Sequence, residues 1–149
     1  MKQLSIINGP NLNMLGKRET NIYGTQDFDT FLKYLTNKYK QVTNIDYFHS
    51  SYEGAIVDKI HSLNNYNGLI INAGALSHTS IAIADALKCI QIDVIEVHIS
   101  NIYKREEFRH QSFLSASLSG VITGLGLRSY ELALIYFINK DNLPENGSN

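Results

Sequence analysis

INGPNLNMLGKRETNIYG, residues 7–24, joins the end of a short apolar stretch to a long polar segment. Strand-to-helix connections in α/β domains usually run about 2–6 residues, and this segment is much longer. Around glycines at positions 9, 16 and 24 it carries amide, cationic and aromatic side chains, namely Asn8, Asn11, Asn13, Arg18 and Tyr23. A strand that opens into such a loop indicates an α/β fold, and we expect residues 9–24 to form an active-site lid.

The rest of the chain alternates apolar and amphipathic stretches. Several apolar stretches are continuous, as expected for strands covered on both faces. The predicted strands are residues 4–7, 45–48, 68–72, 94–99 and 120–123. Apolar side chains recur at helical spacing between them, which predicts helices in residues 28–39, 56–63, 80–90 and 129–138. The first of these helices would begin after a cap at Thr25 or Asp27.

This alternation predicts one domain, residues 1–149, built on a parallel sheet. Five strand–helix units with right-handed crossovers favour a doubly wound, flavodoxin-like α/β fold with strand order 2-1-3-4-5. The polar stretch 139–149, which contains Pro144 and Gly147, predicts a flexible C-terminal tail.

Composition excludes several classes of function. Thirteen basic and fourteen acidic side chains leave a formal net charge of -1, so we expect neither nucleic acid nor an anionic membrane as a partner. No apolar run approaches the roughly 20 residues of a membrane span. A single cysteine, Cys89, excludes an internal disulfide, and together with the lack of a signal-peptide core it indicates the cytoplasm. The apolar neighbours of Cys89 predict a buried, unreactive thiol.

Known cofactor motifs are not found in the chain. Gly120, Gly124 and Gly126 lack the spacing of a dinucleotide-binding loop, and no phosphate-binding Gly-Lys-Ser/Thr sequence occurs. The five histidines show no paired metal-ligand spacing. We therefore expect no metal and no cofactor.

The predicted topology places the site before any family is considered. Ligands of open α/β sheets bind beyond the carboxyl ends of the strands, where the strand order reverses. In the order 2-1-3-4-5, the first, third and fourth strands are neighbours, so Tyr23, Asn72 and His98 should converge on one crevice. These three side chains could supply a base, an amide anchor and an acid to a small polar ligand.

Three long blocks of this sequence resemble the signature blocks of type II 3-dehydroquinate dehydratases. They are residues 7–24, residues 71–87 (INAGALSHTSIAIADAL) and residues 96–110 (EVHISNIYKREEFRH). The resemblance implies a flavodoxin-like fold and the conversion of 3-dehydroquinate to 3-dehydroshikimate and water, in the shikimate pathway or in quinate breakdown. It also implies an anti elimination through an enolate, without metal or cofactor.

The resemblance implies catalytic roles for four residues. Tyr23 would remove the proton beside the ketone, and a nearby arginine, Arg18 or Arg109, would favour its phenolate. Arg18, on the mobile loop, would support the transition state. Asn11 would position a water against the enolate oxygen. His98 would be the general acid.

Several of these residues also have ordinary structural explanations. Tyr23 could be a packed aromatic side chain, Asn11 could form an Asx-turn beside Pro10, and His98 could bond to the backbone. Glu96 lies on the same strand face as His98 by the period of two and could contact its imidazole, which would keep that ring protonated. Arg105, with Lys104, could line a solvated turn.

The resemblance also implies substrate-binding positions and an oligomer. The positions are Asn72, His78, Asp85, Ile99, Ser100 and Arg109, and Arg109 would pair with the substrate carboxylate. The backbone amides of Ile99 and Ser100 would add donors. Asp85 would reach the site of an adjacent subunit, in trimers assembled into a dodecamer.

Two interpretations compete with an enzyme. One is a flavodoxin-like module that binds a nucleotide or flavin without turnover, with the lid contacting phosphate. The other is a purely structural subunit of a large assembly that binds no small acid.

Overall fold

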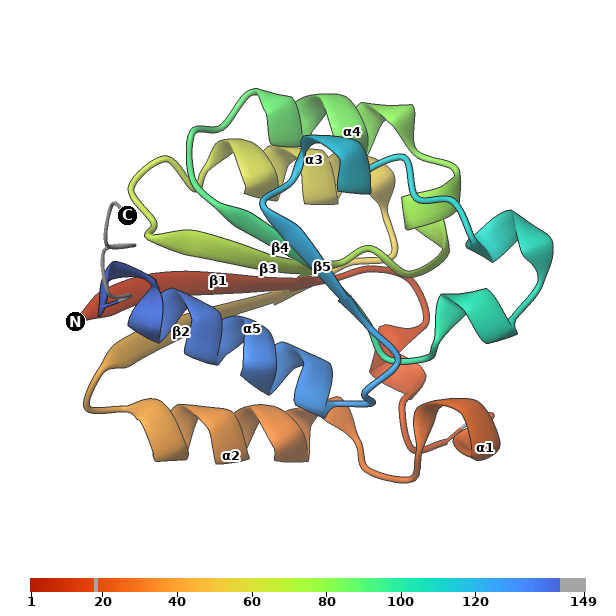
Figure 1. Ribbon diagram of the computed structural model, residues 1–149, viewed down its shortest axis with the longest axis horizontal. Coiled ribbons are helices and arrows are strands. Elements are labelled where there is room, and N and C mark those ends of the chain that lie inside the picture. Colours follow the sequence, from red (N-terminus) through yellow and green to blue (C-terminus); the bar gives the residue numbers. More distant parts are fainter. Residues whose placement is uncertain (18, 143–149) are drawn as a thin grey trace, which may run out of the picture.

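A five-stranded parallel sheet forms the centre of the computed structural model, which describes residues 1–17 and 19–142 (Figure 1). The strands pair in the order β2-β1-β3-β4-β5. This is the predicted doubly wound, flavodoxin-like arrangement. The strands are β1 (Lys2–Asn8), β2 (Thr43–His49), β3 (Gly68–Asn72), β4 (Val94–His98) and β5 (Gly120–Thr123).

The five α-helices that the structure describes lie on the two faces and at one end of this sheet. They are α1 (Thr20–Tyr23), α2 (Phe28–Tyr39), α3 (Glu53–His61), α4 (Ile81–Lys88) and α5 (Arg128–Asn139). Helices α2 and α5 lie on one face and α3 and α4 on the other, whereas α1 lies beyond the end where the strands finish (Figure 1).

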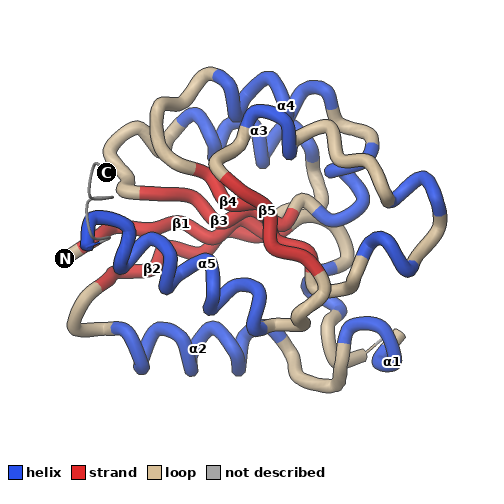
Figure 2. Tube along the Cα trace, viewed as in Figure 1, coloured by secondary structure: helices blue, strands red, loops and turns tan. Residues whose placement is uncertain are grey.

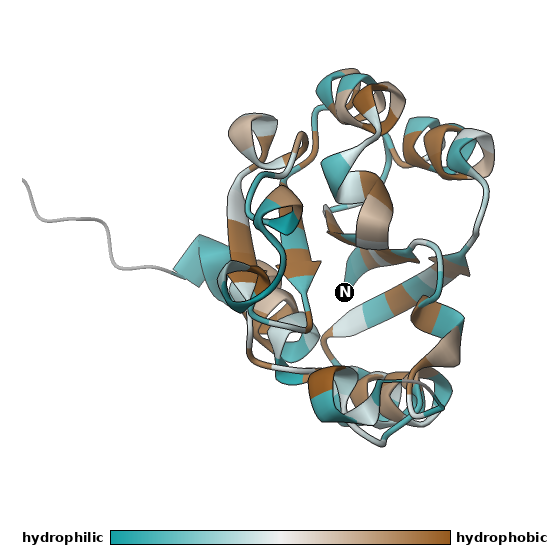
Figure 3. Cartoon of the chain, turned by 90° about the vertical axis from the view of Figure 1, so that its right-hand side faces the viewer, coloured by the Kyte–Doolittle hydropathy of each residue, from teal (hydrophilic) through white to brown (hydrophobic). Residues whose placement is uncertain are grey.

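The core consists of one apolar layer on each face. Leu4 and Ile6 of β1 pack toward α2 and α5, and Ile7 of the same strand packs toward α3 and α4. Successive strand residues point to opposite faces, so a strand covered on both sides is apolar at consecutive positions. In Figure 3, which looks onto the carboxyl ends of the strands, hydrophobic segments recur along both strands and helices.

The ends of the elements depend on polar residues. β1 begins at Lys2, whose ammonium donates to the Phe137 carbonyl at 2.6 Å and to Asp141 at 2.7 Å. Pairing of Lys2 and Gln3 with Thr43 and Asn44 of β2 extends β1 beyond the apolar run that predicts it. At the start of α2, the Asp27 carboxylate accepts from the Thr30 amide at 2.8 Å, so Asp27 is the cap.

The prediction of a buried thiol at Cys89 is wrong. Helix α4 ends at Lys88, and Cys89 caps it in an exposed position, with its thiol donating to the Asp85 carbonyl at 3.3 Å. The buried stripe of this helix consists of Ile83, Ala84, Ala86 and Leu87. Position 89 lies outside that stripe, between the exposed Lys88 and the buried Ile90.

The prediction of a flexible tail is wrong for residues 139–142, because α5 extends through Asn139 and is followed by the 3₁₀-helix Lys140–Asn142. Residues 143–149 of the predicted flexible tail lie outside the described residues. Among the helices that the structure describes, none has the length and apolar character needed to cross a membrane.

Candidate active site

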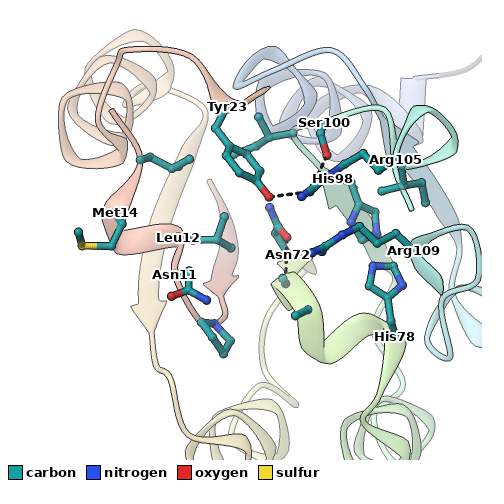
Figure 4. A pocket seen from close by; sticks show the side chains of 16 residues that line it. Asn11, Leu12, Met14, Tyr23, Asn72, His78, His98, Ser100, Arg105 and Arg109 are labelled. Atoms are coloured by element: carbon teal, nitrogen blue, oxygen red, sulfur yellow. Dashed lines mark hydrogen bonds between the residues drawn. The ribbon is translucent and has the colours of Figure 1, made fainter. Parts of the chain in front are cut away.

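A pocket lies at the carboxyl ends of the strands, where the connections are long and contain short helices (Figure 2). Its walls come from the segment after β1, the 3₁₀-helix Gly74–His78, the end of β4 and the segment that follows β4 (Figure 4). Tyr23, Asn72 and His98 all line it, as the topology predicts. The other predicted site residues in its lining are Asn11, His78, Ile99, Ser100 and Arg109.

Two glycines bring the exit of β1 onto the exit of β3. The Gly9 amide donates to the Asn72 carbonyl at 2.8 Å, and a Cβ at Gly9 would lie 2.3 Å from the Ala73 oxygen. Gly74 has a φ of +60°, and a Cβ there would lie 3.0 Å from the Pro10 oxygen. Both positions therefore require glycine.

Asn11 directly follows this junction in a left-handed conformation, with a φ of 70°. Its side chain makes no capping hydrogen bond to the 3₁₀-helix Leu12–Met14. The amide therefore does not serve as a helix cap, and it lines the pocket instead (Figure 4).

The Tyr23 hydroxyl is held by Arg105. Tyr23 is the last residue of α1, and its oxygen accepts a hydrogen bond of 2.6 Å from Arg105 Nη1 (Figure 4). The guanidinium carbon also lies 5.3 Å from the centroid of the Tyr23 ring. A cation that donates to a phenol oxygen stabilises the phenolate.

This contact corrects the expectation for Arg105, because a side chain in a solvated turn would be exposed. The Arg105 side chain is 13% exposed, and Nη1 also lies 3.4 Å from the Ser100 hydroxyl. The sequence suggested Arg18 or Arg109 as the partner of Tyr23. Arg18 lies outside the described residues, and Arg109 pairs with Glu106 at 2.8 Å.

His98 makes the predicted contact with Glu96. The two side chains lie on one face of β4, and His98 Nε2 is 2.9 Å from Glu96 Oε1. Burial alone would raise the pKa of Glu96, but hydrogen bonds from His98, Ser112 and Ser115 outweigh it and the pKa is lowered. Glu96 is therefore an anion beside the imidazole at neutral pH.

His78 forms the wall beside His98. The rings stack with centroids 5.9 Å apart, and His78 Nδ1 lies 2.7 Å from the Gln111 carbonyl oxygen, to which it donates. Burial lowers the pKa of His78, and the nearby charges of His98 and Arg109 lower it further. A neutral His78 that donates from Nδ1 has Nε2 as an acceptor.

The end of β4 is fixed by the strand and loop next to it. The Thr123 hydroxyl donates to the Ser100 carbonyl at 3.1 Å, and the Gly126 amide donates to the Ile99 carbonyl at 3.0 Å. This holds the backbone of Ile99 and Ser100 at the pocket wall.

A buried network orients Asn72. Its Nδ2 donates to the Tyr130 hydroxyl at 2.8 Å, and that hydroxyl donates to Asn8 Oδ1 at 2.7 Å. The Gly74 amide donates to Asn72 Oδ1 at 3.1 Å. Burial raises the pKa of Tyr130, so this phenol stays protonated and can donate.

Asp85 lies apart from the pocket of its own chain. It is on α4 with a side chain that is 66% exposed, and it pairs with Lys88 at 3.6 Å. Of the substrate-binding residues implied by the resemblance, it is the one outside this pocket.

Four residues that contact these groups are not predicted from the sequence as parts of the site: Arg105, Ser112, Ser115 and Tyr130. A signal existed for Arg105, which stands four residues before Arg109 in the block REEFR. Tyr130 lies among the apolar positions of α5, where a buried hydroxyl gives no distinct pattern.

Known proteins resemble this chain over most of its length. The family model for class II dehydroquinase matches residues 2–138. The chain belongs to this family. A 3-dehydroquinate dehydratase from Prochlorococcus marinus is 49% identical over 147 residues, covering 95% of this chain and all of the relative. One from Endomicrobium trichonymphae is 50% identical over 136 residues, which cover 90% of this chain and 95% of the relative.

Solved structures of class II dehydroquinases have the same fold. A type II dehydroquinase from Propionibacterium acnes is 42% identical, with a TM-score of 0.89, and the match covers 93% of this chain and 97% of that one. The corresponding enzyme from Butyrivibrio crossotus is also 42% identical, with a TM-score of 0.88 and coverage of 91% and 97%.

Proposed function

We propose that this chain catalyses the dehydration of 3-dehydroquinate to 3-dehydroshikimate in the shikimate pathway, as an anti elimination through an enolate. The observation that carries this proposal is that one pocket contains both the Tyr23 phenol, hydrogen-bonded to an arginine, and the His98 imidazole, hydrogen-bonded to a carboxylate. An elimination beside a ketone needs a base for a carbon-bound proton and an acid for the departing hydroxyl. The phenol is suited to be the base, and the imidazole is suited to be the acid.

Tyr23 is the base in this mechanism. Its phenolate takes the proton beside the ketone, and the electron pair of that C–H bond forms the enolate. A free phenol is mostly protonated at pH 7, so the base form needs a stabilising partner. The Arg105 guanidinium, 2.6 Å from the oxygen, is suited to that task.

His98 is the acid. As the C–O bond breaks, the hydroxyl takes a proton from the imidazolium and leaves as water, while the enolate electrons form the new double bond and restore the ketone. Nε2 is engaged with Glu96, so Nδ1 is the ring nitrogen left to deliver that proton.

Asn11 and Arg18 would stabilise the enolate. The Asn11 amide lines the pocket and is suited to hold a water against the developing oxyanion. Arg18, in the predicted lid, would add a positive charge when the lid closes, a role taken from the family resemblance.

The other pocket residues would bind the substrate. Arg109, engaged with Glu106 through Nε, would pair with the substrate carboxylate, assisted by the backbone amides of Ile99 and Ser100. Asn72 and His78 present amide and imidazole groups suited to the ring hydroxyls.

Asp85 supports the proposal of an oligomer. It is exposed on α4 of its own chain, which fits the predicted role in the site of a neighbouring subunit. We propose trimers, grouped into a dodecamer, in which α4 of one chain completes the pocket of the next.

The test is a spectrophotometric assay of the purified protein with 3-dehydroquinate, following the conjugated enone of the product. Parallel samples contain a chelator or borohydride. Turnover that persists in both supports a reaction without metal and without a lysine imine. Folded protein that gives no product contradicts the proposal and favours the binding module predicted as the alternative.

A further inference from the structure

Glu96 is a fully buried carboxylate with donors on both oxygens. Its side chain is 0% exposed. Oε1 accepts from the Ser112 hydroxyl at 2.5 Å and lies 2.9 Å from His98 Nε2. Oε2 accepts a short hydrogen bond from the Ser115 hydroxyl. A buried charge is costly unless it is paired and hydrogen-bonded, and here the three contacts supply both.

Both serines come from one connection between β4 and β5, and that connection is fixed to the pocket wall. The Phe113 amide donates to the Ser77 carbonyl at 2.8 Å, and Leu114 is fully buried. Ser115 begins the 3₁₀-helix Ser115–Ser117. The serine hydroxyls are therefore placed by their own segment and do not depend on Glu96 for their position.

We propose that Ser112 and Ser115 are positioning residues that keep the proton of the Glu96–His98 pair on the imidazole. The proposal rests on the role of His98 as the acid. The pair can hold its proton as an imidazolium beside a carboxylate, or as a neutral imidazole beside a carboxylic acid. Two hydroxyl donors stabilise the carboxylate and therefore favour the first arrangement.

The other charged groups near His98 act in the opposite direction. The His78 ring that stacks on His98 is neutral and so offers no negative charge, and the Arg109 guanidinium lines the same pocket. Arg105 lies across the pocket against Tyr23. The two guanidinium cations disfavour a charge on the His98 ring, and the Glu96 anion is the neighbouring group that favours it.

Loss of the serine hydroxyls should move the shared proton from His98 to Glu96. A proton on Glu96 is buried behind His98 and cannot reach the departing hydroxyl. We expect kcat to fall, because fewer molecules hold the acid in its active form. KM should change little, because neither serine lines the pocket.

The test compares Ser115→Ala with Ser117→Ala. Ser117 lies in the same 3₁₀-helix, and its hydroxyl donates to the Leu114 carbonyl at 3.2 Å and not to Glu96. We expect Ser115→Ala to lower kcat about ten-fold, as for the loss of a hydrogen bond to a charged group, with KM within about two-fold. Ser117→Ala should match the parent. A thermal melt of each variant measures any loss of folded protein.

NMR spectroscopy tests the protonation of His98 independently of turnover. In protein labelled with ¹⁵N-histidine, the ring nitrogens of His98, assigned with His98→Ala, report its protonation. We expect Ser115→Ala to shift these signals toward the neutral imidazole at the pH of the assay. Signals that stay at the parent positions would overturn the proposal, whatever the activity.

A double variant tests whether Ser115 affects kcat through His98. In a His98→Ala background, Ser115→Ala should cause no further loss of kcat, because the group it acts through is gone. An equal loss in both backgrounds overturns the proposal. Full turnover by His98→Ala alone is a different outcome, because it refutes His98 as the acid. The NMR measurement then decides by itself whether the serines control the protonation of His98.

Discussion

The Arg105 guanidinium donates to the Tyr23 hydroxyl at 2.6 Å, joining α1 to the segment after β4 across 82 positions of sequence. Tyr23 lies on a short helix that does not pack on the sheet (Figure 1). This hydrogen bond therefore helps to hold α1 and the Tyr23 hydroxyl at the pocket.

Replacing Arg105 with alanine should lower kcat about 10- to 100-fold, because an opposite charge beside the phenol is lost. KM should change less than kcat, because the hydrogen bond that is lost is made to the base and not to the substrate. Lys104→Ala, which removes an exposed neighbouring cation, should leave kcat unchanged. An Arg105→Ala enzyme with the parent kcat would contradict the assignment.

Tyr23→Phe should abolish turnover, because the base is removed, while the fold and the pocket for the carboxylate remain. Steady-state rates and calorimetric titration with a non-reactive carboxylate analogue measure the two effects separately. Tyr103→Phe, at a ring that is 64% exposed, is the matched control. Near-parent turnover by Tyr23→Phe would show that another group removes the proton.

Tyr130→Phe should destabilise the protein by about 1–3 kcal/mol, because Asn8 and Asn72 lose a buried partner. It should also raise KM, since the amide of Asn72 is no longer oriented toward the pocket. Urea unfolding and steady-state kinetics test these effects. Tyr136→Phe, at a residue that is 40% exposed, is the control. Equal KM values in both variants would exclude an orienting role for Tyr130.

Glu131 should make the stability of the protein depend on acid pH. It is a buried residue of α5 that accepts from Lys38 at 2.7 Å and from Tyr39 at 2.8 Å, both on α2. Burial raises its pKa, but these hydrogen bonds outweigh burial, so the pKa is lowered from its ordinary value of 4.5.

Because the folded-state pKa of Glu131 lies below the unfolded value, its stabilisation is present above pH 4.5 and is lost as the pH falls through the folded-state pKa. Melting temperatures of the parent and Glu131→Gln should converge as the pH falls. Glu96 also has a lowered pKa, and both proteins retain it. A constant difference across this range would refute the prediction for Glu131.

Asp85→Ala and Tyr23→Phe should complement each other when their subunits are mixed. A pocket with an intact Tyr23 would then meet a neighbour with an intact Asp85. We expect Asp85→Ala alone to be weakly active and Tyr23→Phe alone to be inactive, and we expect the refolded mixture to regain part of the parent rate. A mixture no more active than its components would mean that Asp85 does not act across subunits.

The sequence predicts the sheet well because its signal is local. Continuous apolar runs identify β3 and β5 with their observed bounds, and the crossover rule gives the strand order. The same topology brings Tyr23, Asn72 and His98 together, because neighbouring strands end at one edge.

The missed contacts are not local. Arg105 meets Tyr23, and Tyr130 meets Asn8, across more than 80 positions, and no periodicity links the members of such pairs. The serines that hold Glu96 lie in a connection without regular periodicity, where the backbone path decides which hydroxyl turns inward. Side-chain direction in such segments is set by tertiary structure.

The exposed thiol of Cys89 offers a natural attachment point for a reporter group. It is the sole cysteine of the chain, so a maleimide dye or nitroxide would label every copy at one place without engineering. That place is one turn of α4 beyond Asp85, whose carbonyl accepts from the thiol. A probe there would report the approach of a second chain to α4 as energy transfer or spin–spin broadening during assembly.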